Sequence, residues 1–373
     1  SPNLYKNNGD NTFTDVSQEA GILNPSFGLG LVTSDLNHDG WTDIYIANDY
    51  FLPDYYYIND KNGSFIESVK EKTGHTSFFS MGADAADFNN DGLLDLGVVD
   101  MTPGDHKRNK VLMASMNVDQ FNILTNKLNY HYQYMFNSLQ LNVGDGLFSE
   151  IGLYSNTAQT DWSWGALFAD FDNDGLKDYL ITNGFRKDTK NNDWRVSLDS
   201  IVESSTKGNL RQRKFEHLQK AESNPVVNYI FKNNGDYTFE DKSYEWGFRE
   251  PSFSNGVVYA DLDLDGDLDI VINNIDKAAF LYKNNAEALN KNNFIRFKIL
   301  DPSGKQPAYN AKVSIYHGDN MQYAELHPVR GYISSVETKL HFGLKNITAI
   351  DSVKIEWLNG YKKTLKNLSA NKT

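Results

Sequence analysis

Four short acidic segments are the part of this sequence whose residue types and spacing could do chemistry. Each has Asp or Asn at positions 1, 3, 5 and 9 and glycine at position 6. Alternate residues of such a turn can point inward, and the glycine allows the chain to reverse sharply. We call these segments the four acidic loops, at residues 35–43, 87–95, 170–178 and 261–269.

The side chains of these loops favour calcium. Carboxylate and amide oxygens are hard ligands that suit Ca²⁺ better than zinc or copper, whereas Mg²⁺ demands stricter octahedral geometry. Position 7 can contribute a backbone carbonyl, which explains why its side chain varies. We therefore expect about four Ca²⁺ ions, one per loop. The predicted ligands are Asp35, Asn37, Asp39, Trp41, Asp43, Asp87, Asn89, Asp91, Leu93, Asp95, Asp170, Asp172, Asp174, Leu176, Asp178, Asp261, Asp263, Asp265, Asp267 and Asp269.

A turn without an ion is the alternative for any single loop, because Asp, Asn and Gly are common turn residues. Four copies that each crowd several carboxylates would repel strongly without a cation. The chain has a net charge of −13, and residues 286–373 have +6, which leaves −19 for the first 285 residues. The excess negative charge therefore lies in the part that contains the loops.

The same composition excludes several classes of site and partner. The acidic balance argues against nucleic acid as a partner. The chain has no cysteine, so it has neither disulfides nor a thiolate metal site. It also has no apolar run long enough to span a membrane.

An internal repeat places the acidic loops. An aromatic-Asn motif recurs with a phenylalanine six residues after the asparagine, and each acidic loop begins 28 residues after that asparagine. A glycine stands five residues before each loop. A fifth copy of the motif, at Asn284, matches only at its start. Identical offsets in four copies establish the repeat. The asparagines are Asn7, Asn59, Asn142 and Asn233, and the glycines are Gly30, Gly82, Gly165 and Gly256.

Successive loops lie 52, 83 and 91 residues apart, so the two longer intervals contain insertions. They occupy residues 101–137 and 184–227, each after the strand that leaves an acidic loop. Apolar residues near helical spacing at 109–128 and 194–202 predict helices. These helices could pack on the repeats or form a surface for a partner.

Between these features the repeats consist of short apolar runs bounded by turn residues, which predict buried strands. Units of this length with about four strands are typical of propeller blades. Residues 290–373 predict a compact β domain with turns at 317–320 and 359–360. The expected fold class is all-β: propeller blades over residues 1–285 with helical insertions, then a β domain over 286–373.

Several conspicuous side chains are interpreted without a catalytic role. His38 in the first loop is expected to be a solvent-facing spacer, because calcium prefers oxygen ligands. His131 and Tyr132, in the first insertion, are expected to be surface or packing residues. Trp162 and Trp164, just before the third loop, are expected in the core.

The repeats with their glycine and acidic loop resemble FG-GAP/VCBS repeats. Residues 330–335, 340–344 and 353–360 resemble an ASPIC/UnbV domain, with Leu358-Asn359-Gly360 where that family usually has Pro-Asp-Gly. The resemblance implies a bacterial cell-surface protein, often an outer-membrane lipoprotein that accompanies TonB-dependent transporters. It also implies a ring of roughly seven blades. This chain would then form an arc, completed by missing sequence or by a partner chain. The family supplies calcium ligands and no catalytic residues.

These observations favour a non-catalytic, extracellular binding or assembly scaffold whose partner is a protein, with a TonB-dependent transporter complex as the implied case. A carbohydrate-active enzyme, either a lyase or a hydrolase, is the alternative. It would need an acid/base pair, or a Tyr/His/Lys constellation, that converges in a cleft. A third interpretation is an adhesin that binds a protein or glycan. The start at Ser1-Pro2, inside a repeat, suggests a mature piece of a longer protein.

Overall fold

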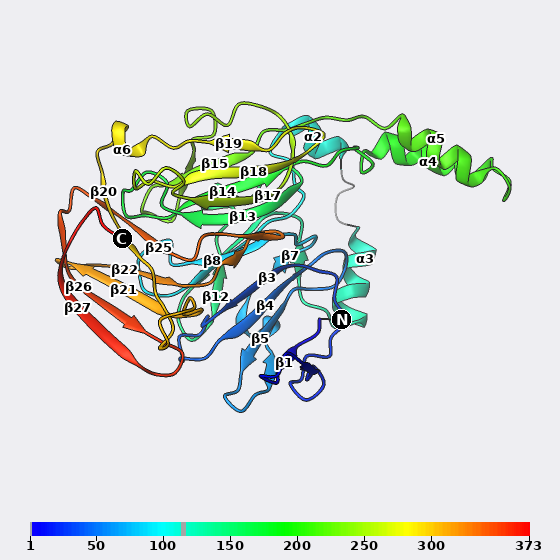
Figure 1. The fold of residues 1–373 in the computed structure, drawn as a ribbon. Helices are drawn as coiled ribbons and strands as arrows, with labels where there is room; N and C mark the ends of the chain where they lie inside the picture. Colours follow the sequence, from blue (N-terminus) through cyan, green and yellow to red (C-terminus); the bar gives the residue numbers. More distant parts are fainter. Residues whose placement is uncertain (1, 113–116) are drawn as a thin grey trace.

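The structure is a computed structural model that describes residues 2–112 and 117–373. It confirms the all-β fold class: antiparallel sheets dominate, and helices occur mainly in the insertions (Figure 1). A short hairpin, β1 (Tyr5–Asn7) and β2 (Phe13–Asp15), precedes the first complete sheet.

Four sheets follow one another along the repeats. The first contains β3 (Gly28–Ser34), β4 (Asp43–Asn48), β5 (Tyr55–Asn59) and β6 (Phe65–Glu67). The second contains β8 (Ala83–Ala86), β9 (Asp95–Val98), β11 (Ser138–Asn142) and β12 (Phe148–Glu150). The third contains β13 (Ser163–Ala169), β14 (Asp178–Asn183), β15 (Tyr229–Asn233) and β16 (Phe239–Asp241). The fourth contains β17 (Phe253–Ala260), β18 (Asp269–Ile275) and β19 (Phe280–Tyr282).

The sheets pack face to face as an arc of blade-like units. Their first strands contact one another in the order β3, β8, β13, β17. Apolar side chains fill the space between neighbouring sheets, as Tyr45 and Leu96 do between the first and second. A glycine permits close approach of two inner strands, since a Cβ on Gly82 would lie 2.0 Å from the backbone oxygen of Trp164. The inner-strand glycines are therefore explained by packing.

The acidic loops and the insertions lie at opposite ends of the sheets. Each acidic loop joins the first strand of a sheet to the second, whereas each insertion joins the second strand to the third. The first insertion contains α2 (His106–Val111), α3 (Val118–Asn122), a π-helix (Ile123–Lys127) and β10 (Gln133–Tyr134), which pairs with β7 (Thr76–Ser77). A short helix, α1 (Val69–Lys72), precedes β7.

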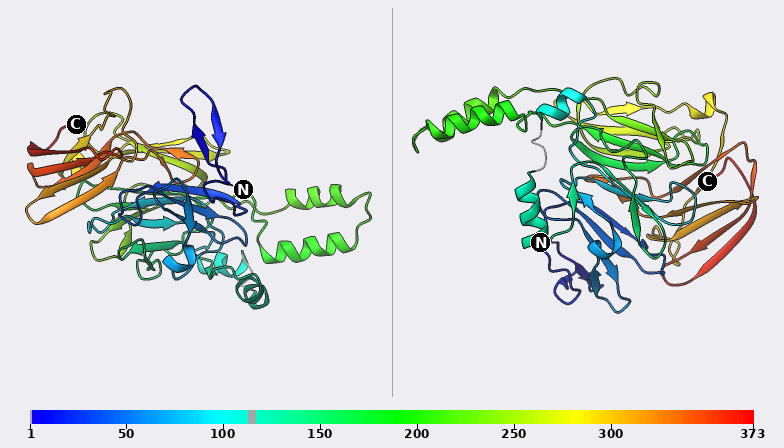
Figure 2. Two further views of the ribbon diagram at one scale, coloured as in Figure 1. Left: turned by 90° about the horizontal axis from the view of Figure 1, so that it is seen from below. Right: turned by 180° about the vertical axis from the view of Figure 1, so that it is seen from behind.

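The predicted helices are confirmed in part. The expectation for 109–128 holds on both sides of residues 113–116, which lie outside the described residues. The expectation for 194–202 corresponds to α4 (Asn192–Glu203). The second insertion also forms α5 (Leu210–Gln219), and the two helices project from the body as an arm (Figure 2).

The C-terminal part forms a β domain with its own core. After α6 (Ala286–Leu289), its strands are β20 (Asn293–Phe297), β21 (Lys312–His317), β22 (Asn320–Glu325), β23 (Val329–Arg330), β24 (Ser334–Ser335), β25 (Leu340–Lys345), β26 (Ala349–Glu356) and β27 (Lys362–Ser369). The turn after β21 and the turn between β26 and β27 confirm both predicted hairpins. Val313, Phe342 and Val353 belong to the domain core.

This β domain lies at the end of the sheets that carries the acidic loops, and one hairpin reaches between the sheets (Figure 1). The hairpin β23–β24 contacts β3 of the first sheet and β17 of the fourth. Its Gly331 pairs with Ala83 of β8. The inner edges of the repeats are therefore bound to a segment of the same chain.

Candidate metal centres

The first three acidic loops share one hydrogen-bonding pattern. In the first, a carboxylate oxygen of Asp35 accepts from the backbone N–H of Asp39 at 2.9 Å and the other accepts from Gly40 at 2.8 Å. The second and third loops repeat both bonds. The carboxylate at position 1 thus lies inside the turn, where a ligand of the first coordination position belongs.

Two positions of each loop have left-handed backbone. Position 6 is glycine with φ between +88° and +97°, as the sequence predicts. Position 4 is also left-handed, with φ of 58° at His38 and 66° at Leu264. Asn, Asp and His tolerate this region better than other residues, but leucine does not. Backbone strain at position 4 is therefore confined to Leu264 of the fourth loop, which the spacing alone does not reveal.

The aromatic-Asn motif holds each loop in place. The backbone N–H of Asn142 donates to Asp95 at position 9 of the second loop, at 2.8 Å. The Asn142 side chain donates to the carbonyls of Leu94 in the same loop and Leu36 in the preceding loop. Asn233 and Asn284 make the equivalent bonds. The motif therefore links consecutive loops, which explains the constant spacing.

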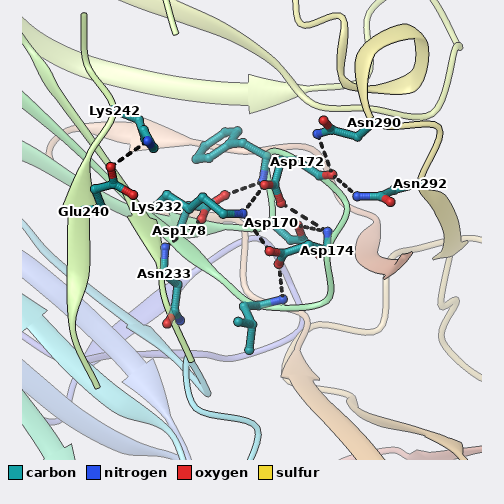
Figure 3. Close-up of polar contacts among 12 residues, drawn as sticks. Asp170, Asp172, Asp174, Asp178, Lys232, Asn233, Glu240, Lys242, Asn290 and Asn292 are labelled. Atoms are coloured by element: carbon teal, nitrogen blue, oxygen red, sulfur yellow. Dashed lines mark hydrogen bonds and ion pairs between the residues drawn. The ribbon is translucent and has the colours of Figure 1, made fainter. Parts of the chain in front are cut away.

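The third loop brings three carboxylates together. Asp170, Asp172 and Asp174 each offer an oxygen within 4.8 Å of the others (Figure 3). Lys232 pairs with Asp172, and its Nζ lies 2.6 Å from Asp174. A fourth carboxylate, Asp178, accepts from Asn233 at 3.0 Å. This all-oxygen set fits Ca²⁺.

The fourth loop forms two such groups. Asp261, Asp263 and Asp265 form the first, and Asp265, Asp267 and Glu287 form the second. One carboxylate oxygen of Asp261 is buried without a hydrogen-bond partner. The donor set and this unsatisfied oxygen both fit a cation.

The first two loops, which have Asn at position 3, form no group of three acids within the described part of the chain. Lys312 of the C-terminal domain pairs with Asp35, and Lys61 lies 3.2 Å from Asp39. The structure thus places all predicted carboxylates on their loops, but gathers three of them closely only in the third and fourth.

Burial controls the ionisation of these groups. It raises the pKa of Asp43 and of Asp87 to about 6. It also raises the pKa of Asp170 and Asp178 well above the ordinary range, with a further contribution from the neighbouring carboxylates. A bound divalent cation would offset both effects, since it favours the charged form.

The C-terminal domain supplies loop contacts that sequence reasoning missed. Arg296 donates to Asp261 at 2.5 Å, and His341 Nε2 lies 2.6 Å from the side-chain oxygen of Asn173 in the third loop. Burial lowers the pKa of His341 to about 3, so the imidazole is neutral. No local pattern marks these residues, because they lie far from the loops in sequence.

The remaining conspicuous residues are either exposed or packed against neighbouring side chains. His38 is exposed, as expected of a spacer. His131 is buried and lies 3.0 Å from the hydroxyl of Thr73, and burial lowers its pKa to about 4. Trp162 and Trp164, predicted in the core, are partly buried and pack against it. Trp162 stacks on Phe185 with ring centroids 3.8 Å apart.

The opposite end of the repeats carries a groove of about 580 Å³ between the two insertions and the first two sheets. Both insertions contribute to it, through Phe121 of α3 and Trp194 of α4. Lys190 lies over the ring of Phe79 at 5.5 Å. The lining residues are Tyr50, Phe51, Phe78, Phe79, Asn117, Gln120, Phe121, Met135, Thr189, Lys190, Trp194, Arg195 and Leu198.

These features define a class of protein: a repeat protein of blade-like sheets with an acidic loop in each repeat and a β domain across the loops. A comparison with known protein families supports this classification. The FG-GAP-like repeat family matches residues 35–98 and 125–181, and the ASPIC and UnbV family matches residues 301–373. The chain is an FG-GAP-repeat protein with a C-terminal ASPIC/UnbV domain, which confirms the resemblance drawn from its motifs.

A comparison with curated proteins gives no match. Among solved structures, a lectin of Agrocybe aegerita that recognises non-reducing terminal N-acetylglucosamine is 14% identical, with a TM-score of 0.33, over 76% of this chain and 60% of its own. The V. cholerae biofilm matrix protein Bap1 is 12% identical, with a TM-score of 0.28, over 90% of this chain and 48% of its own. The chain spans less than two thirds of either protein. TM-scores this low do not establish a shared fold.

FG-GAP-like repeats are typical of extracellular or cell-surface proteins. Within the described residues, every helix is too short or too polar to cross a membrane.

Proposed function

We propose that this chain is a calcium-stabilised binding scaffold of the cell surface. One Ca²⁺ in each acidic loop would fix the loop and, through it, the contact between the repeats and the C-terminal domain. The groove at the opposite end would then be the surface that a partner contacts. The observation that carries the proposal is the position of the acidic loops, between the repeats and the C-terminal domain.

Electrostatics supports the calcium part of the proposal. The loops hold clustered carboxylates whose nearest cations are lysines and an arginine, among them Lys312 at Asp35 and Arg296 at Asp261. Several loop carboxylates are buried, and burying a charge without full compensation is costly. When bound, calcium supplies positive charge and ties together oxygens from one turn.

The groove supports the proposal that the chain binds a partner. Its rings include Phe51, 43% exposed, and Tyr50, 52% exposed, and both come from a loop of the first sheet. Exposed aromatic rings that line a concave surface are enriched at interfaces and ligand sites. Lys190 and Arg195 add positive charge to an otherwise acidic protein, which suits an acidic segment of a partner. A TonB-dependent transporter complex of the outer membrane is the partner that the family resemblance implies.

A carbohydrate-active enzyme or an adhesin remains the alternative. Glycoside hydrolysis needs two carboxyl groups across the bond that is cleaved. Among the residues that the structure describes, those that line the groove include no Asp, Glu or His. Binding is therefore better supported at this groove than hydrolysis by two carboxyl groups. Turnover of a polysaccharide by the purified chain would reverse this preference.

The test is capture of partners from native membranes with the wild-type chain, Trp194→Ala and Phe215→Ala. Trp194 lines the groove, whereas Phe215 is 59% exposed on α5 and does not line it. We expect a partner that the wild type and Phe215→Ala retain and Trp194→Ala loses. Equal capture by all three would contradict a role for the groove.

A further inference from the structure

Position 7 distinguishes the fourth acidic loop from the other three. The residue there is Trp41, Leu93 or Leu176 in the first three loops and Asp267 in the fourth. Trp41 is 46% exposed, whereas Asp267 is fully buried at 0%. Only the fourth loop therefore has a buried carboxylate at a position that otherwise needs no polar side chain.

Asp267 faces two further carboxylates. Asp265, Asp267 and Glu287 each offer an oxygen within 4.8 Å of the others. Glu287 lies on α6, and its backbone N–H donates to Asp267 Oδ2 at 3.3 Å. Asp267 Oδ1 and Glu287 Oε2 are both buried, and no N–H or O–H group of the described residues donates to either, so the two carboxyl groups face each other across a gap that only a proton or a cation can bridge. The fully buried Asp267 thus points an unsatisfied oxygen at two other acids.

Within the described residues, the nearby positive charge reaches Asp265 but pairs with neither Asp267 nor Glu287. Lys283 pairs with Asp263, and its Nζ lies 3.5 Å from Asp265 Oδ2. Arg296 donates to Asp261 on the other side of the loop. A buried carboxylate without a partner is costly, so this group needs either a bound cation or a shared proton.

We propose that Asp265, Asp267 and Glu287 form a second Ca²⁺ site next to the one in the fourth loop, with Asp265 shared between the two ions. The proposal rests on the proposed function, because the first ion of the loop is assumed. Three carboxylate oxygens form a hard ligand set, and backbone carbonyls and water would complete the coordination.

This site would join the last repeat to the C-terminal domain. Glu287 lies on the segment between β19 and β20, the first strand of that domain. Phe294 of β20 lies directly on the loop, since a Cβ on Gly266 would fall 1.8 Å from its ring. An ion held by both Asp267 and Glu287 would therefore fix the start of the C-terminal domain against the fourth loop.

The experiment counts calcium ions on the full chain by native mass spectrometry. The variants are Glu287→Gln and, as the control, Glu250→Gln, which removes an exposed carboxylate paired with Lys277. We expect Glu287→Gln to bind one ion fewer than the wild type and the control. If all three proteins bind the same non-zero number of Ca²⁺ ions, the second site is refuted, but calcium binding by the four acidic loops is not. A wild-type chain that binds no calcium would overturn the proposed function as well.

A second measurement does not depend on a variant. Anomalous diffraction from wild-type crystals grown in Ca²⁺ should show two peaks at the fourth loop, about 4 Å apart. A single peak at Asp261, Asp263 and Asp265 would overturn the proposal, because the second group would then be explained by a shared proton.

Discussion

Arg330 of the C-terminal domain forms a bidentate ion pair with Asp84 on the inner strand of the second sheet. Its Nε lies 2.6 Å from one carboxylate oxygen and its Nη2 lies 2.5 Å from the other. The same guanidinium donates to the hydroxyl of Tyr259 and the carbonyl of Phe168. One side chain thus joins the second, third and fourth sheets.

Replacing Arg330 with alanine is expected to destabilise the chain strongly. Asp84 is 1% exposed and would be left as a buried carboxylate without its partner. Removing one partner of a buried pair costs about 3–5 kcal/mol. The free energy of unfolding, measured with urea, checks this. Lys362→Ala is the control, because its pair with Glu356 is exposed and should contribute less than about 1 kcal/mol. Equal losses in both variants would show that the hairpin is not held by this pair.

Asp54 should contribute to the pH dependence of the free energy of unfolding. Burial raises the pKa of this carboxyl group to about 7 in the folded state. Between the ordinary value near 4 and that value, the folded chain keeps a proton that the unfolded chain has released. The stability of the folded state therefore falls as the pH rises from about 4 to 7.

The variant Asp54→Asn should lack this loss. In saturating Ca²⁺, we expect the wild type to lose on the order of 2–4 kcal/mol more than the variant between pH 5 and pH 8. Urea unfolding at the two pH values measures the difference. Asp199→Asn, an exposed site on α4, should behave like the wild type. Parallel pH profiles for wild type and Asp54→Asn would show that Asp54 does not titrate in this range.

The helical arm should contribute little to stability. Neither α4 nor α5 has a buried residue. Replacing residues 192–219 with a short Gly-Ser linker should change the melting temperature only slightly, because few apolar contacts are lost. Thermal unfolding followed by circular dichroism would measure this. A large fall would mean that the arm packs on the body more closely than its exposure indicates.

Local and periodic features of this protein could be predicted from the sequence. The acidic loops, the aromatic-Asn motif and α4 each depend on residues within one or two repeats. The spacing of Asn142 could be predicted from the sequence, but its role could not. Its side chain donates to the carbonyl of Leu36, which lies 106 residues away. α5 was missed because its sequence is polar over most of its length.

Contacts between segments that lie far apart in the sequence could not be predicted from it. Arg330 lies 246 residues from Asp84, and Lys312 lies 277 residues from Asp35. Glu287 is only 20 residues from Asp267, but it follows the point where the aromatic-Asn motif lapses. These side chains meet because the C-terminal domain packs on the loops, and that packing depends on shape and not on spacing.

Calcium is the central requirement of the proposed function, and thermal unfolding of the metal-free chain tests it most directly. Each site that binds only the folded state should add about 3 kcal/mol at a hundredfold excess of Ca²⁺ over Kd. We therefore predict that chelation lowers the melting temperature, that added Ca²⁺ restores it, and that Asp170→Asn reduces the gain while Asp199→Asn does not. An unchanged melting temperature, in protein shown to be free of metal, would contradict the account.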